Sequence, residues 1–383
     1  MSISGYFRTV FRLLRSKRFL YSHLVEVLID KEALRSNLHS FQKLNPNLSV
    51  APVLKSNAYG HGLIPVAKII SKEAVPFICV DSFFEAMILR NENIATPILI
   101  LGYTPFENIK ASKLSKLSFS VLSLDELKSL AAKVTVPISI HLKIDSGMRR
   151  HGIISADLDE AISILQEHSN ILLEGIYTHL ADADVIGSTQ VKKQISTWNN
   201  CVKRFRQSFL SLRYVHCAAT PGSFYNYDIE ANVMRLGIGL YGVNPSLAEM
   251  VLKPVLEMRS KITSIRNLST GDSVGYNATF TADRPMKVAT IPVGYTEGLD
   301  RRLSNRGAVL INRHLCPIIG RVSMNISSID VTDLPQLKRE DEVIIISKDR
   351  DDPNSIEAMA RTCNTIAYEI MVHIPPHLKR IVV

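Results

Sequence analysis

The sequence predicts an α/β protein, an N-terminal (β/α)8 TIM-like barrel followed by a C-terminal, mostly-β domain. From residue 25 to about residue 242, apolar strand-like runs alternate with segments of helical periodicity. After about Pro254 the pattern changes to short β-rich runs separated by Asn, Gly, Asp and Pro. No G-x-x-x-x-G-K-[ST] segment is present, which argues against a P-loop fold. We place the barrel at residues 25–250, the β domain at 251–383 and a separate extension at 1–24.

The extension has the pattern of a basic amphipathic helix. Its apolar stripe recurs at i, i+3, i+4 and i+7, formed by Phe7, Val10, Phe11 and Leu14. The residues off that stripe include several arginines, and the extension carries no acid. Such a helix can lie on an anionic membrane surface, and its composition also resembles an organellar transit peptide. A disordered extension fits the same residues equally well.

Composition limits the partners of the remaining chain. Much of the net charge of +9 comes from the extension, and the body carries no nucleic-acid-binding motif, so we expect no nucleic-acid partner. The five cysteines are dispersed, with no C-x-x-C pair and no His–Cys cluster. This spacing predicts reduced thiols in the cytoplasm, and neither a disulfide framework nor a metal site. No apolar run reaches membrane-spanning length, so we expect a soluble protein.

The elements follow from periodicity and length. Apolar runs bounded by turn residues predict barrel strands at 25–29, 48–54, 77–80, 98–101, 119–121, 138–144, 172–178, 214–218 and 233–241. Apolar stripes of period 3.6 predict helices at 31–44, 63–71, 83–89, 124–133, 157–168 and 189–210. In the β domain we expect strands at 255–265, 272–280, 286–291, 306–311, 314–320, 326–331 and 342–346, and one helix at 355–363.

The stretch APVLKSNAYGHG, residues 51–62, is the main candidate for chemistry. An apolar run ends in a glycine-rich loop, which predicts that Lys55 lies where a buried strand gives way to a loop. In an α/β barrel, the carboxyl ends of the strands carry the active site. Desolvation there lowers the pKa of a lysine toward the neutral amine, which forms a Schiff base with an aldehyde. The alternative is a lysine whose head group reaches solvent.

Other stretches combine polar groups with glycine turns. They are HLKIDSGMRRHG (141–152), GIYTHLADAD (175–184), HCAAT (216–220), MRLGIGLYG (234–242), VGYNATF (274–280), IPVGYTEG (291–298), GRVSM (320–324) and NTIAYE (364–369). Taken singly, each has an ordinary structural interpretation, such as a surface ion pair, a satisfied core histidine or a packing tyrosine. Glycine-containing turns such as Gly237–Ile238 can also offer backbone N–H groups to a phosphate.

Together, and in this order, these stretches closely resemble the motifs of the alanine racemase family of fold-type III pyridoxal-phosphate enzymes. The resemblance covers about residues 25–383. It implies that Lys55 holds pyridoxal 5'-phosphate. It also implies that the cofactor is contacted by Tyr59, His179, Thr220, Arg235, Gly237, Ile238 and Tyr368. Because a guanidinium with a pKa above 12 does not protonate the pyridine nitrogen, Arg235 would favour racemisation over transamination.

The resemblance further implies a second base, Tyr276, supplied across a homodimer with shared active sites. A free tyrosine has a pKa of ~10, so Tyr276 needs nearby positive charge or hydrogen bonds to act near neutral pH. The substrate would be bound by Arg150, Met324, Tyr276 and Tyr295. Lys143 matches a lysine that is carbamylated in many members of the family, which would convert a cation that repels Arg150 into an anion that orients it.

Three positions depart from the family pattern. Ala219 replaces an asparagine, Asn325 replaces an aspartate, and Arg149 adds a cation beside Arg150 that could compete for its role. The expected activity is the interconversion of L-alanine and D-alanine, which supplies D-alanine for peptidoglycan. Alternatives are a racemase of serine or of a broader set of small amino acids, a non-catalytic pyridoxal-phosphate-binding protein, and a membrane-surface scaffold that uses residues 1–24. A decarboxylase is disfavoured because its His-x-Gly-Ser and Glu-Pro-Gly-Arg signatures are missing.

Overall fold

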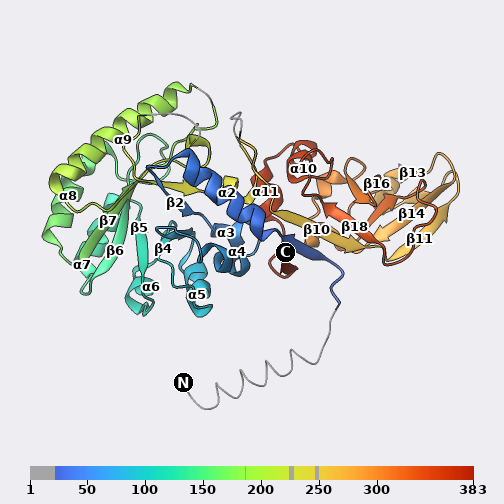
Figure 1. Ribbon diagram of the computed structural model, residues 1–383, viewed down its shortest axis with the longest axis horizontal. Coiled ribbons are helices and arrows are strands. Elements are labelled where there is room, and N and C mark those ends of the chain that lie inside the picture. The colour runs from blue at the N-terminus through green and yellow to red at the C-terminus, as the bar shows by residue number, and fades with distance from the viewer. Residues whose placement is uncertain (1–21, 186, 224–227, 246–249) are drawn as a thin grey trace, which may run out of the picture.

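The computed structural model describes residues 22–185, 187–223, 228–245 and 250–383 (Figure 1). The predicted amphipathic stripe of the extension lies outside the described residues. The two predicted domains lie side by side along the long axis of the molecule, with the barrel at one end and the β domain at the other. Buried apolar residues of both domains form one continuous core. Within the part of the chain that the structure describes, none of the helices has the length and apolar composition needed to cross a membrane.

The barrel is an eight-stranded sheet in the order β2-β9-β8-β7-β6-β5-β4-β3, and its strand pairs are parallel. A parallel bridge between Val53 and Cys79 joins its two edges. Its strands are mostly buried, as expected for a sheet covered by helices. They are β2 (Ser49–Pro52), β3 (Ile78–Val80), β4 (Ile98–Ile100), β5 (Leu117–Val121), β6 (Ile138–Lys143), β7 (Ile171–Tyr177), β8 (Tyr214–His216) and β9 (Val233–Leu236).

Amphipathic helices pack around these strands. They are α2 (Lys31–Leu44), α4 (Leu63–Ile70), α5 (Phe83–Asn91), α6 (Phe106–Ala111), α7 (Leu124–Lys133), α8 (Leu158–Glu167) and α9 (Thr189–Ser208), with the short turn α3 (Lys55–Tyr59) after β2. Serine side chains cap the amino ends of α5, α7 and α9 by accepting a backbone N–H three residues on. Short 3₁₀ turns lie at Ser155–Asp157, Pro221–Ser223 and Ile238–Tyr241.

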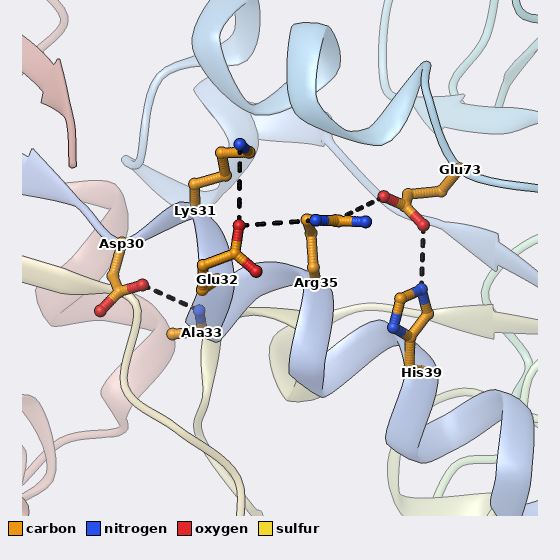
Figure 2. Close-up of polar contacts among 7 residues, drawn as sticks. All are labelled: Asp30, Lys31, Glu32, Ala33, Arg35, His39 and Glu73. Carbon is orange, nitrogen blue, oxygen red and sulfur yellow. Dashed lines mark hydrogen bonds and ion pairs between the residues drawn. The ribbon is translucent and has the colours of Figure 1, made fainter.

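Helix α2 is held by polar contacts at its amino end and along one side of its middle (Figure 2). Asp30 caps the helix by accepting from the Ala33 N–H at 2.8 Å. Further along, Glu73, three residues after the end of α4, accepts from Arg35 Nε at 2.7 Å and lies 2.9 Å from His39 Nε2. The carboxylate thus ties two successive turns of α2 to its neighbour, while Leu34, Leu38 and Phe41 are buried on the other face.

The second sheet has nine strands in the order β11-β14-β17-β16-β15-β18-β10-β1-β19. Its strands are β1 (Glu26–Ile29), β10 (Leu256–Lys261), β11 (Ser264–Leu268), β14 (Met286–Ile291), β15 (Ala308–Ile311), β16 (His314–Ile319), β17 (Ser327–Asp330), β18 (Glu342–Ile346) and β19 (Lys379–Val382). A two-stranded ribbon, β12 (Ser273–Val274) and β13 (Phe280–Thr281), stands apart. Helices α10 (Ile356–Thr362) and α11 (Ala367–Val372) precede β19, and 3₁₀ turns lie at Tyr276–Ala278, Tyr295–Glu297 and Arg301–Leu303.

The predicted fold class, a (β/α)8 barrel followed by a mostly-β domain, is confirmed. One strand is placed differently from the expectation. The strand expected to open the barrel at residues 25–29 forms as β1, but it pairs with β10 and β19 and therefore belongs to the second sheet. Strand β2 is the first barrel strand in the chain.

Candidate active site

Lys55 follows β2 at the carboxyl end of the barrel and opens an unusual turn. Ser56, Asn57, Ala58 and Tyr59 all have φ between 51° and 55°, the left-handed region that costs an L-residue roughly 1–2 kcal/mol. Contacts on several sides hold the turn. The Asn57 N–H donates to Glu85 at 3.0 Å, and Arg380 near the carboxyl terminus donates to the Gly60 carbonyl at 2.8 Å.

A cavity of about 770 Å³ lies over this turn, at the carboxyl ends of the barrel strands. It brings together ten of the predicted site residues: Lys55, Tyr59, Lys143, Arg150, His179, Thr220, Arg235, Gly237, Ile238 and Tyr368. The Lys55 side chain is 40 % exposed and its Nζ lies 3.7 Å from Asp81 Oδ1. The Lys55 head group is therefore partly solvated and paired with a carboxylate, as in the alternative of a lysine that reaches solvent, and it is not fully desolvated.

One end of the cavity suits a phosphate. The Thr220 Oγ1 accepts from the Gly237 and Gly239 N–H groups at 3.2 and 3.3 Å. A side chain at Gly237 would approach the Tyr59 hydroxyl to 2.9 Å, so this backbone position must be glycine for the tyrosine to lie against it. Burial raises the pKa of the Tyr59 phenol, and burial raises the pKa of Tyr368 to about 12. Both phenols therefore keep their protons and can donate hydrogen bonds to an anion.

At the other end, Arg235 is a buried cation held by acceptors at the ends of β7 and β8. Its NH2 group donates to the Thr178 and Cys217 carbonyls at 2.7 and 3.2 Å. Its NH1 group donates to the Nδ1 and carbonyl oxygen of His216 at 2.8 and 3.1 Å. Both terminal nitrogens are thus engaged within the described chain, and the Nε–H is the remaining donor of the guanidinium.

His179 and Lys143 also line this part of the cavity, together with Arg235. Burial and the charge of Arg235 lower the pKa of His179 to about 3, so its imidazole is neutral, with Nδ1 3.3 Å from the Arg235 NH2. Burial, with the charges of Arg150 and Arg235, lowers the pKa of Lys143 to about 8. Its Nζ lies 5.7 Å from the centre of the Tyr177 ring, over which Arg235 also stacks at 5.2 Å.

The structure also distinguishes Arg150 from its neighbour Arg149. Arg150 lines the cavity, whereas the residues lining it do not include Arg149. Arg149 has a left-handed φ of 56°, and its N–H donates to Asp145 at 3.1 Å. Ala219 lines the cavity beside Thr220, so its short side chain leaves space where an asparagine would extend.

Tyr276, Tyr295 and Met324 do not reach this cavity. They lie on the β domain and are 71 %, 46 % and 59 % exposed. Tyr295 and Met324 are neighbours, because the Tyr295 and Thr296 N–H groups donate to the Ser323 and Met324 carbonyls at 3.1 and 3.0 Å. Within one chain, Lys55 and Tyr276 are therefore not brought together.

Asn325 has a clear local partner. Its Nδ2 donates to Glu297 Oε1 at 2.8 Å, and the other oxygen of this buried carboxylate accepts from the Gly294 N–H at 2.9 Å. An aspartate at position 325 would put two carboxylates in contact. The amide is thus matched to Glu297.

Two residues of the site, Asp81 and Tyr177, were not among the sequence predictions. Asp81 directly follows β3, and Tyr177 ends β7 two residues before His179. Their positions at strand ends were the available signal, because that edge of a barrel carries function. No motif covered Asp81, and in the GIYTHLADAD stretch that contains Tyr177 the resemblance assigned a role to His179 instead.

Comparison with known proteins agrees with this geometry. Residues 29–245 match the family description "Alanine racemase, N-terminal domain" and residues 255–382 match "Alanine racemase, C-terminal domain". The alanine racemase of Syntrophobacter fumaroxidans is 35 % identical over 351 residues, covering 90 % of this chain and 93 % of the relative. That of Lactobacillus acidophilus is 32 % identical over 376 residues, covering 94 % and 98 %.

Solved structures give the same result. Alanine racemase from Bacillus anthracis with bound L-Ala-P superposes with a TM-score of 0.88 at 28 % identity, covering 95 % of this chain and 96 % of that one. Alanine racemase from Bartonella henselae with covalently bound pyridoxal phosphate gives a TM-score of 0.83 at 26 % identity, covering 94 % and 100 %. With both domains matched in order over nearly their whole length, the chain belongs to the alanine racemase family.

Proposed function

We propose that this chain is a pyridoxal-phosphate-dependent alanine racemase that interconverts L-alanine and D-alanine. One observation carries the proposal. A single cavity joins the Lys55 amine, the buried Arg235 guanidinium and the turn formed by Thr220 and Gly237. These three groups match the aldehyde, the pyridine nitrogen and the phosphate of the cofactor, so the residues present fit it.

Each residue would hold a different part of the cofactor. Lys55 would hold its aldehyde carbon, and the Thr220–Gly239 segment with Tyr59 and Tyr368 would hold its phosphate. The Arg235 Nε–H would donate to the ring nitrogen without protonating it, because a guanidinium stays charged at any working pH. When bound, pyridoxal phosphate supplies a conjugated ring that takes up the electron pair left on the α-carbon of the substrate.

The chain's own groups then move the proton. Lys55 Nζ takes the α-proton from one face of the substrate or returns it, and the Tyr276 hydroxyl does the same on the opposite face. Arg150 at the rim of the cavity would bind the substrate carboxylate, for which its planar fork is suited. Removal from one face and return to the other inverts the α-carbon.

We further propose a homodimer in which Tyr276, Tyr295 and Met324 of one chain complete the cavity of the other. The exposure of all three on the β domain supports this arrangement, because each is a large side chain facing solvent in the single chain. We also place the protein in the cytoplasm. Its cysteines are buried free thiols, which suits a reducing compartment.

The proposed activity is tested by exchange of D- and L-amino acids on purified protein, with and without added cofactor. We expect alanine to exchange fastest, and we expect Lys55→Ala to lose both exchange and the absorbance of bound cofactor. Lys192→Ala, an exposed lysine on α9, is the matched control and should keep both. Faster exchange of serine would correct the substrate, and bound cofactor without exchange would indicate a non-catalytic protein.

A further inference from the structure

A line of polar side chains runs from Arg235 through the barrel interior, away from the active-site cavity. Arg235 NH1 lies 2.8 Å from His216 Nδ1, and His216 Nε2 lies 2.8 Å from His141 Nδ1. His141 Nε2 in turn lies 3.9 Å from Glu174 Oε2. The two imidazoles and the guanidinium are buried, whereas the Glu174 side chain is 32 % exposed. The proposed mechanism uses Arg235 alone of these four residues.

Arg235, at the start of the line, determines which ring nitrogen of each histidine carries a proton. A guanidinium only donates hydrogen bonds, so His216 Nδ1 must accept and the proton of that ring must lie on Nε2. That proton points to His141 Nδ1, so the proton of His141 must lie on its own Nε2, facing the carboxylate. Any other pair of neutral tautomers loses a bond or opposes two N–H groups.

Both imidazoles are neutral in this arrangement. Burial and the nearby Arg235 charge lower the pKa of His141 to about 3 and lower the pKa of His216 well below its ordinary value. Two protons, one on each ring, therefore lie in an ordered line that ends at Glu174.

The backbone is shaped to place Glu174 at the end of this line. Strands β6 and β7 pair in register up to Ile140 and Leu173, and the next partners are His141 and Gly175. Glu174 is thus the extra residue of a bulge, a device that re-aims a side chain. Gly175 is needed as well, because a side chain there would approach His141 Nδ1 to 2.9 Å. Ser118 holds the carboxylate by donating at 2.5 Å.

A second cavity, of about 510 Å³, lies at this end of the line. Both His141 and Glu174 line it, and the rings of Phe77 and Tyr214 pack against His141 at 5.4 and 5.5 Å between centres. The aromatic rings shield the imidazoles, while the carboxylate is partly exposed to solvent.

We propose that Glu174, acting through His141 and His216, is a positioning residue for Arg235. Arg235 fixes the tautomers from one end of the line, and the carboxylate favours the same Nε2–H tautomers from the other end. That choice keeps an acceptor on Arg235 NH1 and holds the Nε–H of the guanidinium in place for the ring nitrogen. The proposal extends the proposed function to residues outside the active-site cavity and rests on it for the role of Arg235.

The test is Glu174→Gln, which keeps the shape of the side chain and removes its charge. In cofactor-free protein labelled with ¹⁵N-histidine, NMR should show His141 and His216 as pure Nε2–H tautomers in the wild type and as mixtures in the variant. In loaded enzyme, kcat should fall by up to about 100-fold while KM for alanine changes little, because a displaced guanidinium acts on the reacting ring. Ser118→Ala, a milder change, should shift both readouts in the same direction.

Glu167→Gln is the matched control, because this exposed carboxylate also accepts from a serine hydroxyl, Ser163 at 2.6 Å. It should change neither readout. Unchanged tautomers in Glu174→Gln would overturn the proposal. The two proposals fail separately, since absent racemase activity in the wild type would remove the proposed function and leave the tautomer result standing.

Discussion

Lys143 is a buried cation whose charge is disfavoured by its surroundings. Its side chain lies among Arg150, Arg235 and the Tyr177 ring, and its pKa of about 8 leaves on the order of a tenth of the amine unprotonated at pH 7. An unprotonated amine is the form that reacts with CO₂. The carbamate would carry a negative charge, so it would attract both guanidinium groups where the ammonium repels them.

We therefore predict that Lys143 is carbamylated in CO₂-equilibrated buffer. Protein incubated with ¹³C-bicarbonate should show a carbamate carbon signal by NMR, and Lys143→Ala should lack it. The variant should also bind substrate more weakly, because Arg150 loses the anion that orients it. A wild-type spectrum without the signal would leave Lys143 as a plain amine.

At the scale of single elements, the left-handed turn after Lys55 is the most demanding piece of backbone. Gly60 closes it with a φ of 81°, and a methyl group there would lie 1.9 Å from the Met371 carbonyl oxygen of α11. Substitution at this position therefore adds a backbone clash to the cost of a left-handed residue. The turn and α11 must move apart to relieve it, which would carry Lys55 out of place.

We expect Gly60→Ala to lower the free energy of unfolding by more than about 4 kcal/mol, a size reserved for specific structural damage. Gly271→Ala is the control. Its φ is 94° but nothing lies within 4 Å of the added methyl, so it should cost only the strain of about 1–3 kcal/mol. Urea denaturation of the two variants isolates the clash. Equal losses would show that α11 does not constrain the turn.

The contact of α2 with Glu73 gives a pH-dependent prediction. Burial raises the pKa of Glu73, but hydrogen bonds from His39 and Arg35 outweigh it and leave the pKa below its ordinary value of 4.5. A carboxylate with a lowered pKa stabilises the fold above about pH 4.5, and this contribution is lost as the pH falls through the folded-state value.

Glu73→Gln should therefore lower the free energy of unfolding by about 1–3 kcal/mol at pH 7, with a smaller difference from the wild type below pH 4.5. Glu160→Gln removes an exposed ion pair with Lys128 and should cost less than about 1 kcal/mol. Urea unfolding followed at several pH values measures both. A pH-independent loss in Glu73→Gln would mean that shape rather than charge holds α2.

Local patterns predicted the elements that are long and strongly periodic. Helix α2 follows residues 31–44 as expected, because its stripe and its Asp30 cap agree. Periodicity did not separate β10 from β11, which were expected as one run, and it did not indicate α6, whose six residues carry little helical signal. The left-handed turn was also missed. Its residues have no special propensity for that backbone, which depends on Glu85, Arg380 and α11 far along the chain.

At the scale of the whole molecule, the sequence could not predict that β1 belongs to the second sheet and not to the barrel. Residues 25–29 have the apolar content of any buried strand, and their partners are β10 and β19, both distant in sequence. The motifs did bring ten residues to one cavity. Motif order alone carries no information on which chain completes a site, and it was the resemblance to the family that implied a Tyr276 standing apart from the cavity of its own chain.

That separation makes a two-chain prediction possible. If Tyr276 acts in the cavity of a partner, a heterodimer of Lys55→Ala and Tyr276→Phe chains contains one intact site and one site lacking both groups. Purified through two different affinity tags, it should show about half of the wild-type activity, although each variant alone is inactive. If Lys55 and Tyr276 acted within one chain, the same heterodimer would be inactive.

The reciprocal pairing is the control. A wild-type chain is paired with a chain that carries both Lys55→Ala and Tyr276→Phe. This heterodimer contains the same two substitutions as the first, but both lie on one chain. With sites shared between chains, each cavity lacks one base and the heterodimer should be inactive, whereas sites within one chain would leave half of the activity. Because the two heterodimers differ only in which chain carries each change, loss of stability affects both alike, and an active control with a dead test would show that each chain supplies its own tyrosine.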